Sequence, residues 1–242
     1  MRTYGIIQHT MRLHRFYITE TLEEKSIIIY NRDLIHQWRK VFRYNVGSQV
    51  IVFNGDGSDY RATIMTMKPS EAELLVLETK EVVQPSKNIW LCLSLIKKDN
   101  FELVVQKAVE LGVMHIVPVV GERSEKKNIN LERLQKIILE ATEQSGRGEL
   151  LKLHPLTTTE ELFQGGALPQ EKIFFHPGYP AIKEYLEQTG EYSCAYFIGP
   201  EGGFSDDEIE FFKEYNVTGL SLGTNILRAE TAAIAGAVIL SL

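Results

Sequence analysis

The chain has 242 residues with 26 basic and 32 acidic side chains, so its formal net charge is −6. Hydrophobic residues make up 44% and charged residues 24% of the chain, which is typical of a globular protein and excludes a disordered or low-complexity one. The length suits one large domain or two small ones. The acidic balance argues against a protein that coats nucleic acid by bulk charge.

Several common site signatures are missing. Cys92 and Cys194 are far apart and each lies in an apolar run, which favours two buried thiols in a reducing compartment over a disulfide. The histidines lack metal-ligand spacing, so no metal is predicted. The N-terminus does not resemble a signal peptide, and the most apolar segment, residues 231–242, is shorter than the roughly 20 residues that span a bilayer. We therefore expect a cytoplasmic protein with no membrane partner.

Short strand-like segments separated by turns fill the first third of the chain. Asn, Gly, Pro and Ser residues mark the turns, and one helical segment, residues 34–42, interrupts the strands. The predicted strands are residues 26–30, 49–53, 60–67 and 72–77. Short strands at such close spacing predict a small β-barrel of about 70 residues.

The pattern changes near Pro85, after which apolar runs alternate with helical periods. Strands are predicted at residues 89–96, 116–120, 173–176, 195–198 and 217–222. Helices are predicted at residues 101–111, 131–143, 181–188 and 229–242, and one more begins at Ser205. Asp99 or Asn100 is the expected N-cap of the first of these helices and Gly112 its stop, while Ser205 and Glu208 have capping-box spacing. This alternation indicates an α/β fold with a mainly parallel sheet.

Two glycine-containing turns carry the first chemical signal. Residues 199–203 read Gly-Pro-Glu-Gly-Gly between a predicted strand and a helix, and residues 222–228 join another such pair. The backbone N–H groups of such a turn can approach a ligand closely, although each turn alone could be a tight connection. A dinucleotide-binding fold has its glycine motif after the first strand, where this chain has Lys97, Lys98 and Asp99. That order disfavours NAD and the common Rossmann-type methyltransferases alike, and a Walker P-loop is missing.

The two turns and four upstream motifs resemble those of a known family. GPEGGFSDDEIE followed by LGTNILRAETAAIAGAVIL is similar to the end of the RsmE-type ribosomal RNA methyltransferases, members of the SPOUT superfamily. Four further matches come in family order, namely MRLHRFYI at residues 11–18, KKDNFELVVQKAVELGV at residues 97–113, ERS at residues 122–124 and EQSGR at residues 143–147. The resemblance covers residues 11–242.

The resemblance implies a two-domain α/β protein. Residues 11–82 would form an N-terminal PUA-like RNA-binding β-barrel, and residues 87–242 a C-terminal SPOUT α/β methyltransferase domain with a deep trefoil knot, a rare exception to unthreaded topology. The candidate RNA contacts in the barrel are Arg12, Arg15, Arg32, Arg39, Lys40 and Arg43. Trp38 could stack on a base, but a place in the barrel core suits it better. The last predicted helix is apolar on nearly all sides, which suits burial or the homodimer interface typical of SPOUT proteins.

The resemblance also implies S-adenosylmethionine, bound between the two glycine-containing turns. Apolar walls and backbone hydrogen bonds there suit an adenine ring. The predicted cofactor-binding residues are His176, Ile198, Gly199, Pro200, Glu201, Gly202, Gly203, Leu222, Gly223, Ile226, Leu227 and Arg228. For His176 the alternative is a turn residue ahead of Pro177.

The implied reaction is methyl transfer to N3 of a uridine in 16S ribosomal RNA of the small ribosomal subunit, at the position conventionally numbered 1498. This transfer requires aligned reactants and removal of the N3 proton. Arg147 and Arg228 are the candidates for binding phosphate or polarising the uracil carbonyls, and Glu143 and Glu230 for accepting the proton. The alternatives are an exposed loop position for Arg147 and a helix-start ion pair for Arg228 and Glu230.

Two other functions stay open at this point. One is a SPOUT methyltransferase with another target, such as a ribose 2′-hydroxyl. The other is a non-catalytic RNA-binding SPOUT protein, which the departures from the family pattern at Asn100 and Asn225 would suit.

The charge divides unevenly between the two predicted domains. Residues 1–80 carry 11 basic and 9 acidic side chains, and residues 81–242 carry 15 and 23. A mildly basic barrel would then accompany an acidic catalytic domain. RNA recognition should therefore depend on local contacts and RNA shape more than on bulk charge.

Overall fold

The computed structural model describes residues 13–22, 25–125, 128–188 and 193–241. The chain divides into two compact units, Met1–Val82 and Val83–Leu242, each with its own hydrophobic packing. Arg12, one of the predicted RNA contacts, lies outside the described residues. Among the residues described, no helix is long and apolar enough to cross a membrane.

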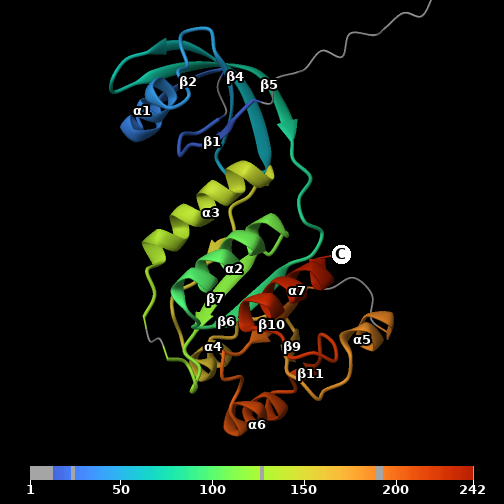
Figure 1. Ribbon diagram of the computed structural model, residues 1–242. Helices are drawn as coiled ribbons and strands as arrows, with labels where there is room; N and C mark the ends of the chain where they lie inside the picture. The colour runs from blue at the N-terminus through green and yellow to red at the C-terminus, as the bar shows by residue number, and fades with distance from the viewer. Residues whose placement is uncertain (1–12, 23–24, 126–127, 189–192, 242) are drawn as a thin grey trace, which may run out of the picture. The chain divides into compact units, whose positions relative to one another are not determined.

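The first unit is built on a five-stranded sheet in the order β1-β3-β4-β5-β2 (Figure 1). Its strands are β1 Arg15–Tyr17, β2 Ser26–Ile29, β3 Gln49–Phe53, β4 Ser58–Met67 and β5 Ala72–Glu81, and its helix is α1 Arg32–Lys40. β1 pairs parallel with β3, and the other neighbours pair antiparallel. The short β1 was not predicted from the sequence. The four predicted strands are confirmed, β3 with the predicted bounds and the others with shifted ends, and α1 begins two residues before the predicted helix.

Helix α1 closes the core of this unit. The Asn31 side chain accepts hydrogen bonds from the backbone N–H groups of Asp33 and Leu34 and so caps the helix. Trp38 is fully buried and packs edge-on against Phe16, with the ring centroids 5.5 Å apart. The indole therefore belongs to the core and is not available to stack on a base.

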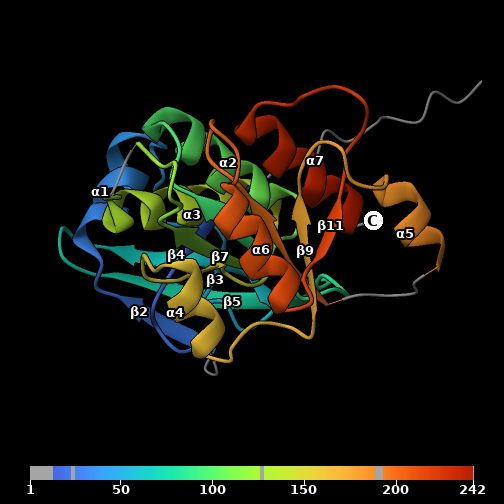
Figure 2. The same ribbon diagram turned by 90° about the horizontal axis from the view of Figure 1, so that it is seen from below.

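The second unit is a six-stranded parallel sheet in the order β11-β9-β10-β6-β7-β8 with helices on both faces (Figure 2). The strands are β6 Ile89–Ser94, β7 His115–Val119, β8 Lys152–Leu153, β9 Glu171–Phe175, β10 Cys194–Ile198 and β11 Thr218–Leu220. The helices are α2 Lys98–Glu110, α3 Leu131–Ser145, α4 Thr159–Gln164, α5 Ile182–Gln188, α6 Asp206–Glu214 and α7 Ala229–Ser241. The predicted parallel α/β sheet is confirmed, whereas β8 and α4 were not predicted.

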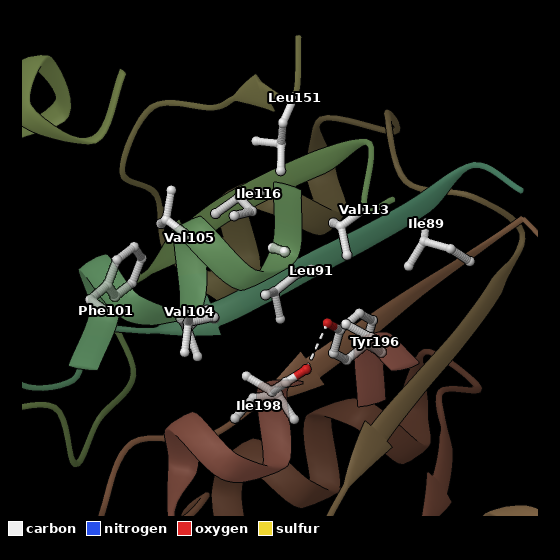
Figure 3. Close-up of a cluster of buried hydrophobic side chains, with 14 of the residues drawn as sticks. Ile89, Leu91, Phe101, Val104, Val105, Val113, Ile116, Leu151, Tyr196 and Ile198 are labelled. Carbon is white, nitrogen blue, oxygen red and sulfur yellow. Dashed lines mark hydrogen bonds between the residues drawn. The ribbon is translucent and has the colours of Figure 1, made fainter. Parts of the chain in front are cut away.

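Alternate residues of each strand fill two separate cores. Leu91 and Leu93 of β6 face α2, α3 and α7, where Figure 3 shows side chains of α2, β6, β7 and β10 meeting. Trp90 and Cys92 face the opposite core, which includes Phe212 of α6. Both cysteines are buried and unpaired as predicted, and burial raises the pKa of each thiol.

Helix α7 approaches the sheet closely because its inner face is made of small residues. A Cβ built on Gly236 would lie 2.9 Å from the Tyr196 ring and 3.0 Å from the Phe175 ring. The Tyr196 hydroxyl donates to the Ala233 carbonyl oxygen at 3.0 Å, which ties β10 to α7 (Figure 3). The other face is less buried than expected, since Val238 is 37% exposed.

The helix-start predictions have mixed outcomes. The capping box of Ser205 and Glu208 is confirmed, with both reciprocal hydrogen bonds present. The N-cap of α2 is Lys97, so the prediction of Asp99 or Asn100 was wrong, because the helix starts one turn earlier than the apolar period. Gly112 follows the end of α2 in the left-handed region, at φ +85°, as a helix stop requires.

Three aromatic side chains stack at the amino-terminal ends of β6 and β7. The rings of Trp90 and His115 are 3.8 Å apart and nearly parallel, and His115 Nδ1 lies 2.9 Å from His154 Nε2. Burial lowers the pKa of His115 to about 4, with further lowering by His154 and Lys152. The same causes, burial and Lys152, lower the pKa of His154.

We predict that acid destabilises the protein through this cluster. The unfolded chain takes up a proton on His115 near pH 6.5, whereas the folded chain does so only near pH 4, so stability is lost as the pH falls through that window. The half-exposed ring limits the loss to about 1 kcal/mol. Thermal unfolding measured from pH 7.5 to 4 should show this fall for the natural chain. The fall should be smaller in His115→Phe, which keeps the stacking, and an equal fall in both proteins would contradict the assignment.

Candidate functional site

A cavity of about 650 Å³ opens at the carboxyl ends of β9, β10 and β11. Because β9 pairs with both β10 and β11, the turns that follow those two strands flank the end of β9. All of the predicted cofactor-binding residues except Gly223 line the cavity, as does Glu230. The structure therefore brings the two glycine-containing turns together, as the resemblance implied.

Sequence reasoning missed part of the lining. Lys97 and Asn100 reach the cavity from the start of α2, because β6 ends at the same edge of the sheet. The further lining residues are Phe175, Phe204, Ser221, Ala229 and Ala232, whereas Pro177 and Asn225 belong to the segments already predicted for the site. Most of them adjoin predicted residues along the chain, so extending each turn by a few positions would have found them.

The turn after β10 folds back tightly on itself. Gly203 donates from its backbone N–H to the Pro200 carbonyl at 2.8 Å and has a φ of +69°, which favours glycine. A Cβ on Gly199 would lie 3.1 Å from both the Gly203 carbonyl carbon and the Phe204 nitrogen. Glycine is therefore needed at both positions for the turn to keep its shape.

Polar residues at the start of α7 form part of the cavity wall. Arg228 is exposed and Glu230 half-buried, and both line the cavity. Within the described part of the chain, neither side chain forms an ion pair, so the helix-start ion pair considered from the sequence is not present. A guanidinium without a carboxylate partner at a cavity wall is available to an anionic or carbonyl group of a ligand.

His176 combines the two roles considered for it. Its ring lines the cavity, while its Nδ1 lies 2.8 Å from the Pro177 carbonyl oxygen at the following turn. Its backbone N–H donates to Leu220 of β11 at 2.9 Å, which extends the pairing of β9 with β11. The residue thus holds the turn and forms part of the wall.

Arg147 and Glu143 lie away from the cavity. The Arg147 guanidinium donates to the carbonyl oxygens of Val109 and Val113, at 3.2 and 2.6 Å, near the amino-terminal end of β7. It is 8% exposed, and its burial lowers the guanidinium pKa to about 10. Glu143 is in the last turns of α3 and does not line the cavity. The expectation that Arg147 and Glu143 belong to the catalytic centre does not fit these positions. The Arg147 side chain donates its hydrogen bonds to carbonyl groups at and after the end of α2 instead.

The predicted RNA contacts of the first unit differ in exposure. Arg32, Arg39, Lys40 and Arg43 are exposed on α1 and the turn after it. Arg15 is not available in the same way: its side chain is 7% exposed, pairs with Asp59 at 2.6 Å, and lies over the Phe53 ring. The prediction of an RNA contact at Arg15 is therefore corrected to a structural ion pair.

Among the described residues, no group of three or more His, Cys, Asp or Glu side chains could hold a metal ion.

Comparison with known proteins assigns the class. A family profile described as RNA methyltransferase domain matches residues 83–241. A ribosomal RNA small subunit methyltransferase E from Rickettsia conorii is 30% identical over 93% of this chain and 93% of its own length. The Bacillus subtilis protein of the same name is 27% identical over 91% of this chain and 93% of its own length.

Two solved structures share the fold over most of the chain. The ribosomal RNA small subunit methyltransferase E of Neisseria gonorrhoeae, bound to S-adenosylmethionine, aligns with a TM-score of 0.84 at 26% identity, covering 94% of this chain and 96% of that one. A Legionella pneumophila methyltransferase, also in complex with that cofactor, aligns with a TM-score of 0.84 at 30% identity, covering 95% and 97%.

The fold, the cavity and the profile match define an RNA methyltransferase. More narrowly, the chain belongs to the ribosomal RNA small subunit methyltransferase E family, which confirms the resemblance found in its sequence.

We predict that Gly199→Ala weakens the binding of S-adenosylmethionine about tenfold, equivalent to about 1.4 kcal/mol. The added methyl group meets backbone atoms at 3.1 Å, so the turn must open. Isothermal titration calorimetry measures the change. Gly165→Ala is the matched control, because Gly165 has an ordinary φ of −69° and lies at the end of α4, outside the cavity lining. Equal affinities in the two variants would refute the role of the turn.

We predict that Arg147→Ala destabilises the protein by about 2–4 kcal/mol and leaves cofactor affinity unchanged. The substitution leaves the carbonyls of Val109 and Val113 without their buried donor. Urea unfolding and calorimetry measure the two quantities. Arg133→Ala, which removes an exposed ion pair with Glu102, should change stability by less than about 1 kcal/mol. A stable Arg147→Ala protein that binds cofactor poorly would restore the site role.

Proposed function

We propose that this protein transfers a methyl group from S-adenosylmethionine to N3 of a uridine in 16S ribosomal RNA, at the position conventionally numbered 1498. The observation that carries the proposal is the cavity lined by both glycine-containing turns, with Arg228 and Glu230 at its wall. The names of the relatives support the small-subunit RNA as substrate. Such a substrate places the enzyme in the cytoplasm.

The residues of the cavity fit the cofactor. A volume of about 650 Å³ is in the range of small-molecule sites, and it exceeds what one ligand the size of a nucleoside needs. The close folding of the turn at Gly199 brings its backbone groups to the cavity wall, where they could contact a flat ring, while Ile198 and Leu222 offer apolar walls. When bound, S-adenosylmethionine supplies a methyl group on a positively charged sulfur.

The side chains at the start of α7 would act on the target base. Uracil N3 lies between two carbonyl groups and must lose its proton before it can attack a methyl group. Arg228 would donate hydrogen bonds to a carbonyl oxygen and stabilise the negative charge that develops there. Glu230, on the same wall, would take the proton or orient Arg228. Because the cavity brings the reactants together, alignment supplies much of the rate.

The first unit would supply RNA affinity. Arg32, Arg39, Lys40 and Arg43 form an exposed basic group on and after α1, suited to phosphates and unpaired bases. We infer that this unit is a PUA-like barrel and that the turns after β10 and β11 belong to a deep trefoil knot. The five-stranded sheet of the first unit and the close approach of the two turns at the cavity support these inferences.

We further infer a homodimer. The outer surfaces of α2 and α7, which lie side by side (Figures 1 and 2), expose Leu103 at 40% and Val238 at 37%. Both are apolar side chains next to half-buried apolar neighbours, such as Ile234 and Ile239. A second copy that packs on these helices would cover them. Sedimentation equilibrium of the natural chain tests this inference, and a strictly monomeric protein would refute it.

The decisive experiment maps the methylated base. Small ribosomal subunits that lack the modification are incubated with the protein and with S-adenosylmethionine labelled in the methyl group. We expect label on N3 of a single uridine at the stated position. Label on a ribose, or at another nucleotide, would replace this proposal by a methyltransferase with another target. No transfer, despite measurable cofactor binding, would favour the non-catalytic RNA-binding alternative.

We predict that Arg228→Ala lowers turnover about a hundredfold while changing cofactor affinity less than tenfold. Loss of one positioned donor at a developing negative charge costs about that factor. Turnover is measured with labelled cofactor and affinity by calorimetry. Arg133→Ala is the control, because Arg133 pairs with Glu102 away from the cavity. Arg123 is unsuitable as a control position, because it contacts the cavity wall from outside. Unchanged turnover in Arg228→Ala would refute its catalytic role.

A further inference from the structure

The turn that forms one wall of the cavity is held from outside by an arginine. Arg123 Nη1 donates to the carbonyl oxygens of Gly202 and Phe204, at 3.2 and 3.0 Å. Its aliphatic stem lies against the same turn, since a Cβ built on Gly202 would be 3.5 Å from Arg123 Cβ. Arg123 follows β7 and does not line the cavity itself. It therefore acts on the wall without reaching a ligand inside.

A glutamate completes this attachment. Glu208, in the first turn of α6, accepts from the Glu122 backbone N–H at 3.2 Å with one carboxylate oxygen and from the Ser205 N–H at 2.7 Å with the other. Glu208 is 8% exposed, and its bond to the Ser205 N–H is buried, which shields that bond from water. Arg123 and Glu208 together join the turn after β7 to both ends of the segment 202–205.

The opposite side of the same turn is also fixed. Glu201 Oε1 accepts a hydrogen bond from the Lys97 backbone N–H at 3.1 Å, at the start of α2. Lys97 is an N-cap without a side-chain cap of its own. The turn after β10 is thus attached to the ends of β6 and β7, and Arg123 is the side chain that binds carbonyl oxygens of the turn itself.

We propose that Arg123 is a positioning residue for cofactor binding, which keeps residues 199–204 in the shape that accepts S-adenosylmethionine. The inference rests on the proposed placement of that cofactor in the cavity. A segment with three glycines has a large conformational entropy when free, and ordering it upon binding costs affinity. A guanidinium bound to two backbone carbonyls orders the segment before the ligand arrives, through charge-assisted hydrogen bonds.

The test measures cofactor binding in Arg123→Ala and Arg123→Lys. We expect the Kd for S-adenosylmethionine, from calorimetry, to rise about tenfold in Arg123→Ala, while kcat at saturating cofactor stays within about threefold. Arg123→Lys should recover part of the affinity, because an ammonium group still donates to carbonyl oxygens. Arg133→Ala is the matched control: it removes an arginine of similar exposure whose partner, Glu102, lies away from the turn.

A second readout needs no cofactor. Amide hydrogen exchange of the cofactor-free protein should become faster at residues 199–205 in Arg123→Ala and stay unchanged in β6 and α3. A purely structural role for Arg123 would instead accelerate exchange throughout the second unit.

The outcomes separate the two proposals. If the natural chain binds S-adenosylmethionine and Arg123→Ala binds it equally well, or if exchange rises throughout the unit, the positioning role is overturned and the proposed function stands. If the natural chain does not bind the cofactor, the placement of the cofactor fails and the positioning role fails with it. A Kd that rises only in Arg123→Ala, together with local exchange, supports the role.

Discussion

The parallel pairing of β9 with both β10 and β11 is the constraint on which the site depends. Ile173 pairs with Tyr196 on one side and with Thr218 on the other. The register of the three strands therefore determines where the turns that follow them lie relative to one another. Parallel strands end at one edge, and this edge gathers segments that are far apart along the chain. The cavity is therefore a product of sheet register. The helices contribute by holding the sheet from both faces, closely enough at Gly236 that only a glycine fits there.

Those parts of the fold that have a local signal could be predicted from the sequence. Apolar runs such as Gln49–Phe53 fix a strand by composition alone, and Ser205 with Glu208 marks a helix start within four residues. The missed elements differ in kind. β8 has two residues and no signal of its own, whereas α4 carries a readable capping box at Thr158 and Glu161 that its short length concealed. β1 is short as well and pairs with β3 more than thirty residues later, so only the tertiary structure defines it.

The candidate site likewise contains residues with a local sequence signal and residues whose contacts only the tertiary structure defines. Most of the residues that line the cavity could be located from the sequence, because they follow strands directly and their glycines mark the turns. Arg147 was assigned to the site because of its motif, yet its side chain donates hydrogen bonds to the carbonyl groups of Val109 and Val113. No sequence pattern indicates that contact. Arg15 is a similar case, since its partner Asp59 lies 44 residues away. The contacts of Arg123 span about 80 residues, which explains why the ERS motif was visible in the sequence while its structural use was not.

The pairing of β6 with β10 has a consequence for how the protein folds. Ile89 is the register partner of Cys194, more than a hundred residues later in the chain, and β10 lies between β6 and β9 in the sheet. The entropy of closing so long a segment must be lost before β6 and β10 can pair, which slows folding of sheets with distant neighbours. Until that closure occurs, the largely apolar β6 can pair with β7 but not with β10, so a newly made chain exposes a strand edge that invites aggregation and chaperone binding.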